Sequence, residues 1–262
     1  GSATRGADGD IQFLRWGNSG GLPVIVLAPV DVEDCYFLTI QAFNLAEKFR
    51  CPVFMASNKE IAMTRENVDV HAVAKPEIIE RSVPPPGKSF VPFETCSGQL
   101  TPYFLPIGGN VPVRQTSSTH SPDGYITTDS DKIAKIQKRL KTKLVSTVDG
   151  FSFYEAYLEK GADTLLLTYG VTARAARDVY TAQKKHGTPV SLLILKTLWP
   201  VPQDLIREKA ENVSRVVVVE MNLGQYVREI ERILPEKKVD FLGQMDGRLI
   251  PPKRIQEGIA HV

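Results

Sequence analysis

Charged and aromatic side chains crowd a glycine-rich stretch near the start of the sequence. The group, which lies just before an apolar run, consists of Asp8, Asp10, Arg15, Trp16 and Asn18. A guanidinium offers a planar fork of hydrogen-bond donors, so Arg15 beside Trp16 suits a carboxylate or the face of a ring. The same pattern fits an arginine that pairs with Asp8 or Asp10 and a tryptophan that packs at an interface. We predict a loop facing substrate or cofactor, with Arg15, Trp16 and Asn18 as its site residues.

A second polar group lies at the end of the apolar run RVVVVE. Here Glu220 and Asn222 belong to the stretch EMNLGQ, where a buried strand is expected to end. Doubly wound sheets place their polar groups at the carboxyl ends of their strands. Satisfying the backbone of a turn explains these two residues at least as well as contact with a ligand does. We therefore predict that Glu220 and Asn222 form a turn at a domain interface.

The common nucleotide, hydrolase and metal motifs are absent. The sequence has no G-x-G-x-x-G after a strand, no G-x-x-x-x-G-K-[ST] and no G-x-S-x-G. Its four histidines and three cysteines show no C-x-x-C, H-E-x-x-H or H-x-H spacing, which argues against a metal ion or iron–sulfur cluster held by this chain alone. Ala7 also breaks the Gly-Asp-Gly sequence with which thiamine-diphosphate enzymes hold Mg²⁺ and diphosphate.

A basic helix is expected over residues 129–145. Its apolar residues form a narrow seam, and six positive charges between Lys132 and Lys143 occupy the rest of the surface. Such a face either meets an anionic ligand or partner, or is a solvated helix surface, and the solvated surface is the more common case.

An α/β fold must position these groups. Apolar runs at residues 22–29 and 52–57 predict two buried parallel strands on either side of a helix over residues 33–50, which Asp31 caps. Beyond the basic helix, strands and helices alternate, which predicts a doubly wound parallel sheet. Its strands are expected at residues 164–169, 190–195, 215–220 and 239–242, and its helices at 172–186, 200–210 and 224–234.

Proline-rich and turn-rich sequence separates the two regions. We predict a partial domain over residues 1–66, an extended connecting arm with the basic helix over 67–150, and the doubly wound domain over 151–262. Two strands and a helix cannot close a core, so residues 1–66 are expected to be the tail of a longer domain. Their strands should leave an apolar edge or pair with another chain, while residues 151–262 should fold independently.

Composition favours an ordinary globular protein. Hydrophobic residues make up 42% of the chain and the net charge is +2, so bulk electrostatics give no sign of a nucleic-acid partner. No apolar run is long enough for a membrane span, and the first residues lack the core of a signal peptide. The scattered Cys35, Cys51 and Cys96 argue against a disulfide framework, and we expect a cytoplasmic protein.

Several stretches resemble the alpha subunits of 2-oxoacid:ferredoxin oxidoreductases. The sequence GDIQFLRWGNSGG at residues 9–21 is similar to the segment after the family's pyrimidine-binding core, and residues 28–53 resemble the family almost throughout. Further similar stretches follow in family order at residues 118–124, 166–170, 198–200, 219–225 and 246–251. The resemblance covers nearly the whole chain, and the order of the stretches makes it specific.

The resemblance implies an enzyme that decarboxylates a 2-oxoacid with thiamine diphosphate, passes electrons through iron–sulfur clusters to ferredoxin and yields an acyl-CoA. Residues 1–66 would then end a pyrimidine-type thiamine-diphosphate domain, and residues 151–262 would form a transketolase C-terminal-like domain. A partner beta subunit would carry the diphosphate, Mg²⁺ and an iron–sulfur cluster, with CoA as co-substrate. The resemblance favours 2-oxoglutarate or a related acid over pyruvate.

The resemblance also implies that the family's acidic residue on the aminopyrimidine, and its substrate-binding Thr and Arg, lie before Gly1. The cofactor needs that carboxylate, so we expect no turnover by this chain alone and assign no catalytic residue. Two alternatives stay open: a non-catalytic transketolase-like module for docking or assembly, and half of a sugar or deoxyxylulose enzyme. The Pro-rich arm argues against the second alternative.

Overall fold

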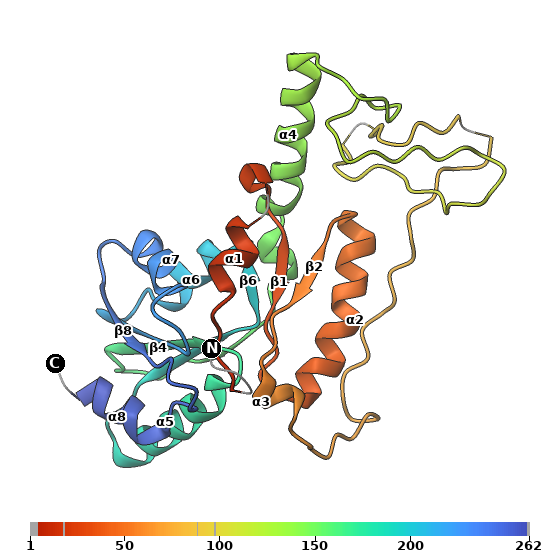
Figure 1. The fold of residues 1–262 in the computed structure, drawn as a ribbon. Helices are drawn as coiled ribbons and strands as arrows, with labels where there is room; N and C mark the ends of the chain where they lie inside the picture. Colours follow the sequence, from red (N-terminus) through yellow and green to blue (C-terminus); the bar gives the residue numbers. More distant parts are fainter. Residues whose placement is uncertain (1–4, 18, 88, 97, 261–262) are drawn as a thin grey trace.

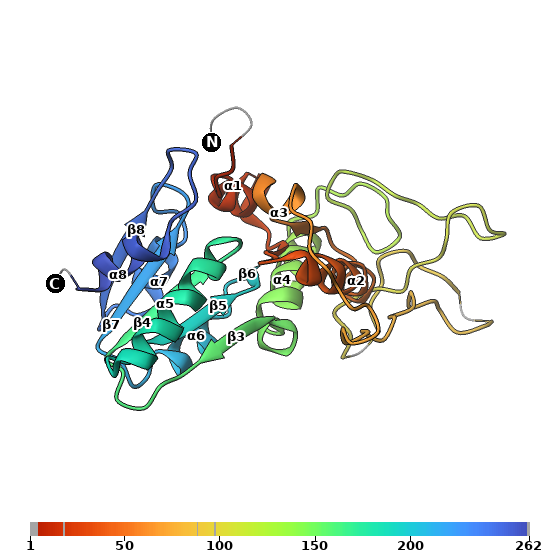
Figure 2. The ribbon, with the colours of Figure 1, turned by 90° about the horizontal axis from the view of Figure 1, so that it is seen from below.

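Two sheets and a long arm organise the chain in a computed structural model (Figure 1). The structure describes residues 5–17, 19–87, 89–96 and 98–260. The larger, C-terminal sheet and the arm lie on opposite sides of the molecule, with the smaller sheet between them (Figure 2). None of the described helices is long and apolar enough to cross a membrane.

The C-terminal sheet has the strand order β3-β5-β4-β7-β8. Its strands are β3 (Tyr154–Tyr157), β4 (Thr164–Tyr169), β5 (Ser191–Leu195), β7 (Arg215–Glu220) and β8 (Lys238–Gly243). Parallel pairing of β4 with β5 on one side and β7 on the other reverses the winding at β4. The prediction of a doubly wound parallel sheet is confirmed. The edge strand β3, which pairs antiparallel with β5, was not predicted.

Helices cover both faces of this sheet. The bounds are α5 (Thr172–His186), α6 (Gln203–Lys209), α7 (Val227–Ile233) and α8 (Pro252–Ala260). Because side chains alternate along a strand, Leu166 packs in the cluster that holds α5 and α8, whereas Leu165 and Leu167 pack in the one that holds α6 and α7. Burial on both faces explains why β4 is a continuous apolar run. Helix α8 was not predicted.

The smaller sheet has the order β2-β1-β6. Its strands are β1 (Ile25–Leu27), β2 (Val53–Met55) and β6 (Thr197–Trp199), and α2 (Val32–Phe49) packs against β1. The predicted cap of α2 is confirmed, because Asp31 accepts a hydrogen bond from the backbone N–H of Asp34 over 2.8 Å. The expectation that β1 lacks a neighbour was wrong, since β6 pairs antiparallel with it and β1 is fully buried.

The predicted N-terminal loop is in fact a short helix, α1 (Ile11–Trp16), followed by the 3-10 turn η1 (Ser19–Gly21). The helix forms because Ile11 inserts into the core shared with the C-terminal sheet, and the N–H of Leu14 donates to the carbonyl of Asp10 over 2.8 Å. Arg15 and Trp16 therefore lie on a helix, and Asn18 lies outside the described residues.

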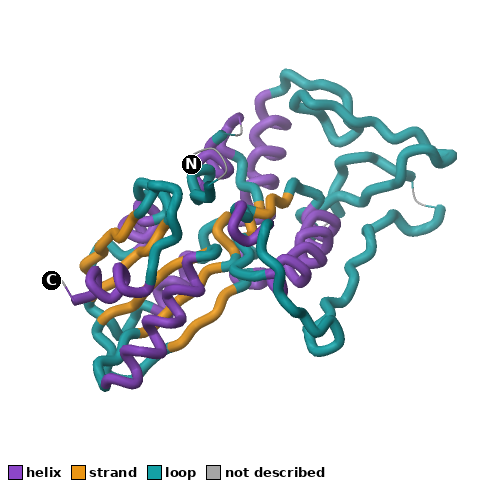
Figure 3. Tube along the Cα trace, turned by 60° about the horizontal axis from the view of Figure 1, so that its bottom comes forward, coloured by secondary structure: helices purple, strands orange, loops and turns teal. Residues whose placement is uncertain are grey.

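An arm without regular helices or strands runs from α3 (Lys59–Ala62) to α4 (Ser130–Val145) through the described residues (Figure 3). Arg50, with Asn44 and Glu47 of α2, attaches the arm to this helix. The Arg50 guanidinium lies 4.7 Å from the ring centre of Phe93 and 4.3 Å from that of Phe104. It also donates to the carbonyl of Pro92 over 2.8 Å. Helix α4 lies where the basic helix was predicted.

Candidate functional site

The N-terminal segment lies against the turn that follows β7. The Asn222 amide donates to the carbonyl of Asp8 over 3.0 Å, and the N–H of Asp8 donates to the carbonyl of Met221 over 3.0 Å. Two further bonds join Gln12 and Gln225: the N–H of Gln12 to Oε1 of Gln225 over 2.8 Å, and Nε2 of Gln12 to the Gln225 carbonyl over 2.7 Å. The two polar groups singled out in the sequence thus belong to segments that touch.

This contact occupies the carboxyl ends of β4 and β7, where the strand order reverses. In doubly wound sheets this crevice is the usual place for a ligand. Here the chain's own residues fill part of it, because the carboxylate of Asp8 lies within 3.7 Å of where a Cβ on Gly170 would stand. Gly170, at φ +59°, joins β4 to α5 and leaves room for that carboxylate.

Glu220 is buried at the carboxyl end of β7, and both oxygens of its carboxylate are hydrogen-bonded. Its carboxylate accepts from the Tyr169 hydroxyl over 2.8 Å and from the Asn222 amide over 2.9 Å. It also accepts from the backbone N–H groups of Tyr226 and Val227, over 2.9 and 2.8 Å, at the start of α7. The positive end of the helix stabilises the buried charge. Because both oxygens are used internally, Glu220 holds the turn in place instead of presenting a free base.

Asp8 is the one described carboxyl group in this crevice with an oxygen left unpaired. Its Oδ1 accepts from the Asn58 amide over 3.3 Å, whereas its Oδ2 is buried and has no hydrogen-bond partner among the described residues. Burial raises the pKa of Asp8 to about 6, against the opposing effect of the Asn58 hydrogen bond and with a further contribution from Glu220. Asp8 can therefore gain or lose a proton near neutral pH.

Arg15 and Trp16 lie apart from that crevice, on the far end of α1. The Arg15 guanidinium stacks over the Trp16 ring at 4.0 Å, and its Nη1 donates to the carbonyl of Gly21 over 3.0 Å. Among the described residues, Arg15 forms an ion pair neither with Asp8 or Asp10 nor with any other carboxylate. Trp16 is 57% exposed. The pair faces a groove of about 790 Å³.

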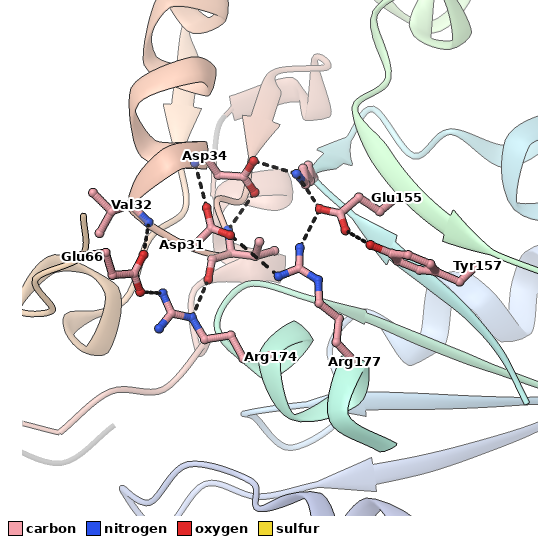
Figure 4. A network of polar contacts seen from close by, with 10 residues as sticks. Asp31, Val32, Asp34, Glu66, Glu155, Tyr157, Arg174 and Arg177 are labelled. Atoms are coloured by element: carbon pink, nitrogen blue, oxygen red, sulfur yellow. Dashed lines mark hydrogen bonds and ion pairs between the residues drawn. The ribbon is translucent and has the colours of Figure 1, made fainter. Parts of the chain in front are cut away.

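A network of charges joins the two sheets (Figure 4). The Lys196 amine lies 2.6 Å from the Asp34 carboxylate at the start of α2 and 2.7 Å from Glu155 on β3. Arg177 on α5 pairs with Glu155 over 2.6 Å. Although burial acts in the opposite direction, Arg177 and Lys196 lower the pKa of Glu155 to about 2.

The same network extends toward the start of the arm. Arg174 on α5 pairs with Glu66 and donates to the carbonyl of Val30 over 3.1 Å. Glu66 in turn accepts from the N–H of Val32 over 3.1 Å. Since these charges satisfy one another, the network serves to attach α2 to the C-terminal sheet.

The described residues do not fit a magnesium–diphosphate site on their own. They contain no group of three or more metal-ligating side chains. Asp8, the acidic residue of the broken motif, is engaged by Asn58 and Asn222 and faces Gly170. The cofactor expected from the resemblance therefore finds no diphosphate cradle in this part of the chain.

The sequence indicated the turn but not all its partners. Tyr169, Asn58 and Gln12 were not singled out, although each bonds to a residue of the crevice. Tyr169 ends an apolar strand just before a glycine, and a reversal of strand order places that end beside the end of β7. That rule was the available signal for Tyr169. No comparable sequence signal exists for Asn58 and Gln12.

Two family models match the chain, one after the other. Residues 1–139 match the thiamine diphosphate-binding domain of pyruvate flavodoxin/ferredoxin oxidoreductases. Residues 162–255 match core domain II of pyruvate:ferredoxin oxidoreductase.

Named relatives and a solved structure are similar over the same span. The 2-oxoglutarate synthase subunit KorA of Methanothermobacter marburgensis is 32% identical, over 97% of this chain and 68% of its own length. KorA of Methanocaldococcus jannaschii is 31% identical, over 99% of this chain and 69% of its own length. The 2-oxoglutarate:ferredoxin oxidoreductase of Magnetococcus marinus has the same fold, with a TM-score of 0.88 at 24% identity. That match covers 99% of this chain and 46% of the solved chain.

Proposed function

This chain belongs to the pyruvate flavodoxin/ferredoxin oxidoreductase family, and we propose that it forms part of the alpha subunit of a 2-oxoacid:ferredoxin oxidoreductase. Such an enzyme decarboxylates a 2-oxoacid oxidatively, yields an acyl-CoA and delivers electrons to ferredoxin. The observation that carries the proposal is the 32% identity with a 2-oxoglutarate synthase subunit over 97% of this chain. It favours 2-oxoglutarate as the acid.

The thiamine diphosphate and Mg²⁺ of this enzyme belong, in our proposal, to a site shared with a beta subunit that also holds an iron–sulfur cluster. When bound, the cofactor supplies the stabilised carbanion on which decarboxylation depends. The Gly-Asp-Gly sequence, which is broken at Ala7, is the reason for proposing a shared site. This chain contributes positioning: Asn222, which is itself bonded to Glu220, holds the N-terminal segment against the C-terminal sheet.

Reconstitution tests the reaction. The alpha subunit that contains this chain is combined with its beta subunit, and ferredoxin reduction is measured with 2-oxoglutarate, pyruvate or 2-oxoisovalerate. We expect reduction that requires CoA and is fastest with 2-oxoglutarate. Faster reduction with another acid would replace 2-oxoglutarate as the proposed substrate. No reduction of ferredoxin with any of the three acids would overturn the proposed function.

Calorimetry tests the shared site separately. The 262-residue chain alone should show no saturable binding of thiamine diphosphate in the presence of Mg²⁺. The assembled subunits should bind it. Micromolar binding by the isolated chain would contradict the division of the site between subunits.

A further inference from the structure

The basic face of α4 and the Arg15–Trp16 pair, which are far apart in the sequence, line one groove. The groove has a volume of about 790 Å³ and lies between α4 and the segment of α1 and η1. Lys138 and Lys141 line it from α4, and Arg15 and Trp16 line it from α1. In Figure 1, α1 lies near the middle of the molecule, next to the lower part of α4.

The lining of this groove is positively charged. It includes three cations, Arg15, Lys138 and Lys141, and no acidic side chain. None of the three forms an ion pair within the described part of the chain. Arg15 also lines the adjoining cavity of about 540 Å³, where Glu229 acts on it electrostatically and pairs with Arg232 over 2.9 Å. Lys138 and Lys141 line only the groove, where no acidic side chain faces them. Clustered cations attract an anionic ligand.

The groove also offers an apolar surface and bare backbone. Trp16 is 57% exposed and Val145, at the end of α4, is 45% exposed. Gly20 and Gly21 line the groove with φ values of 74° and 61°, a region that favours glycine, so the main chain there carries no side chains. The stacking of Arg15 on Trp16 fixes the guanidinium beside the ring.

We propose that this groove binds a phosphorylated nucleotide, with the phosphates at Lys138, Lys141 and Arg15 and the base against Trp16 and Val145. Guanidinium and ammonium groups are the usual protein partners of phosphate, and an exposed indole suits a flat ring. The volume falls within the range of small-molecule sites. The nucleotide is either the adenosine phosphate part of CoA or a free adenine nucleotide. Only the assignment to CoA rests on the proposed function.

Calorimetric titration of the purified chain tests the site with three probes: CoA, ATP and inorganic tripolyphosphate. We expect CoA and ATP to bind saturably, and at least tenfold more tightly than tripolyphosphate. CoA binding tenfold tighter than ATP identifies CoA as the source, and equal binding identifies a free nucleotide. Equal affinity for tripolyphosphate would overturn the nucleotide assignment, and the absence of saturable binding would overturn the site.

Two double variants of α4 supply a matched comparison. The change Lys138→Gln with Lys141→Gln should weaken ATP binding tenfold or more. The change Lys132→Gln with Lys135→Gln removes the same charge from exposed positions of the same helix outside the groove, and should alter affinity less than twofold. An equal loss of ATP affinity in both double variants would show that only the overall charge of the helix matters, and would overturn the site.

The tryptophan has its own test. Trp16→Leu should weaken binding of ATP about tenfold and leave that of tripolyphosphate within twofold. Equal losses for both probes would show that the ring does not contact the base. Because these are binding measurements on the isolated chain, they are independent of ferredoxin reduction. An inactive assembly whose chain still binds ATP contradicts the proposed function and leaves the groove intact.

Discussion

The side-chain amine of Lys143 on α4 donates a hydrogen bond to the carbonyl of Phe49, the last residue of α2. A second hydrogen bond reaches the carbonyl of Arg50 over 3.3 Å. The last carbonyls of a helix have no partners within the helix and carry partial negative charge, so a cation there replaces water. Lys143 is only 3% exposed, and burial lowers its pKa to about 8. One of the six basic residues is therefore an internal support and not part of a solvated face.

We expect Lys143→Met to destabilise the protein by about 1–3 kcal/mol, because the carbonyls at the end of α2 lose a buried donor. Urea denaturation monitored by circular dichroism measures the change. Lys135→Met, at an exposed position of the same helix, is the control and should stay within about 0.5 kcal/mol of the parent. Similar stabilities for the two variants would show that the contact contributes nothing.

Asp8 should make stability depend on pH in the acidic range. Its folded-state pKa of about 6 lies above the ordinary value of 3.8, so the folded protein holds the proton more tightly than the unfolded chain. The resulting stabilisation is fully present below pH 3.8 and is lost as the pH rises through 6, by roughly 1–3 kcal/mol. Asp8→Asn should abolish this component.

Thermal melts between pH 3.5 and 7 measure the effect of Asp8→Asn as a difference from the parent. Asp10→Asn removes an exposed neighbouring carboxylate and should retain the slope of the parent. If Asp8→Asn retained it as well, Asp8 would not be the group that titrates.

Glu220→Gln should cost at least about 2 kcal/mol. The amide nitrogen of glutamine would meet the N–H donors of Tyr226 or Val227, leaving buried groups unpaired. Hydrogen exchange of the Val227 amide should accelerate as the start of α7 loosens. Glu231→Gln, an exposed change on the same helix, should leave both exchange and stability near those of the parent. Unchanged exchange in Glu220→Gln would rule out the proposed capping role.

Arg50→Met should loosen the part of the arm around Phe93 and Phe104. The variant loses the hydrogen bond to Pro92 and the contacts of the guanidinium with Phe93 and Phe104. Limited proteolysis by thermolysin should then cut within residues 67–128 at least tenfold faster, while the C-terminal sheet stays resistant. Arg65→Met, at an exposed position at the start of the arm, is the control. Equal cleavage rates would mean that other contacts hold the arm.

The elements that could be predicted are those whose sequence pattern has one explanation. β4 and β7 occupy the predicted residues because a strand buried on both faces leaves an unbroken apolar run. The cap of α2 was predictable from Asp31, since capping is local chemistry. By contrast, β6 has three residues and forms because β1 lies beside it, which no local pattern reveals.

The candidate sites show the same difference between what a local pattern predicts and what only folding brings together. Glu220 and Asn222 were placed at the end of a strand by a general rule of doubly wound sheets, and they lie there. The helical state of Arg15 and Trp16 depends on the burial of Ile11 against the other sheet, so a glycine-rich sequence suggested a loop. Their position opposite α4 is a property of the folded chain alone.

The pairing of β1 with β6 determines when, during translation, the smaller sheet can form. Leu27 is translated about 170 residues before its neighbour Thr197. At roughly 5–20 residues per second, translation takes on the order of ten seconds or more to cover that distance. During this interval the nascent β1 has one free hydrogen-bonding edge and an apolar side chain at every position. The smaller sheet therefore becomes complete only after β6 has been translated, and until then a chaperone could shield the exposed edge of β1.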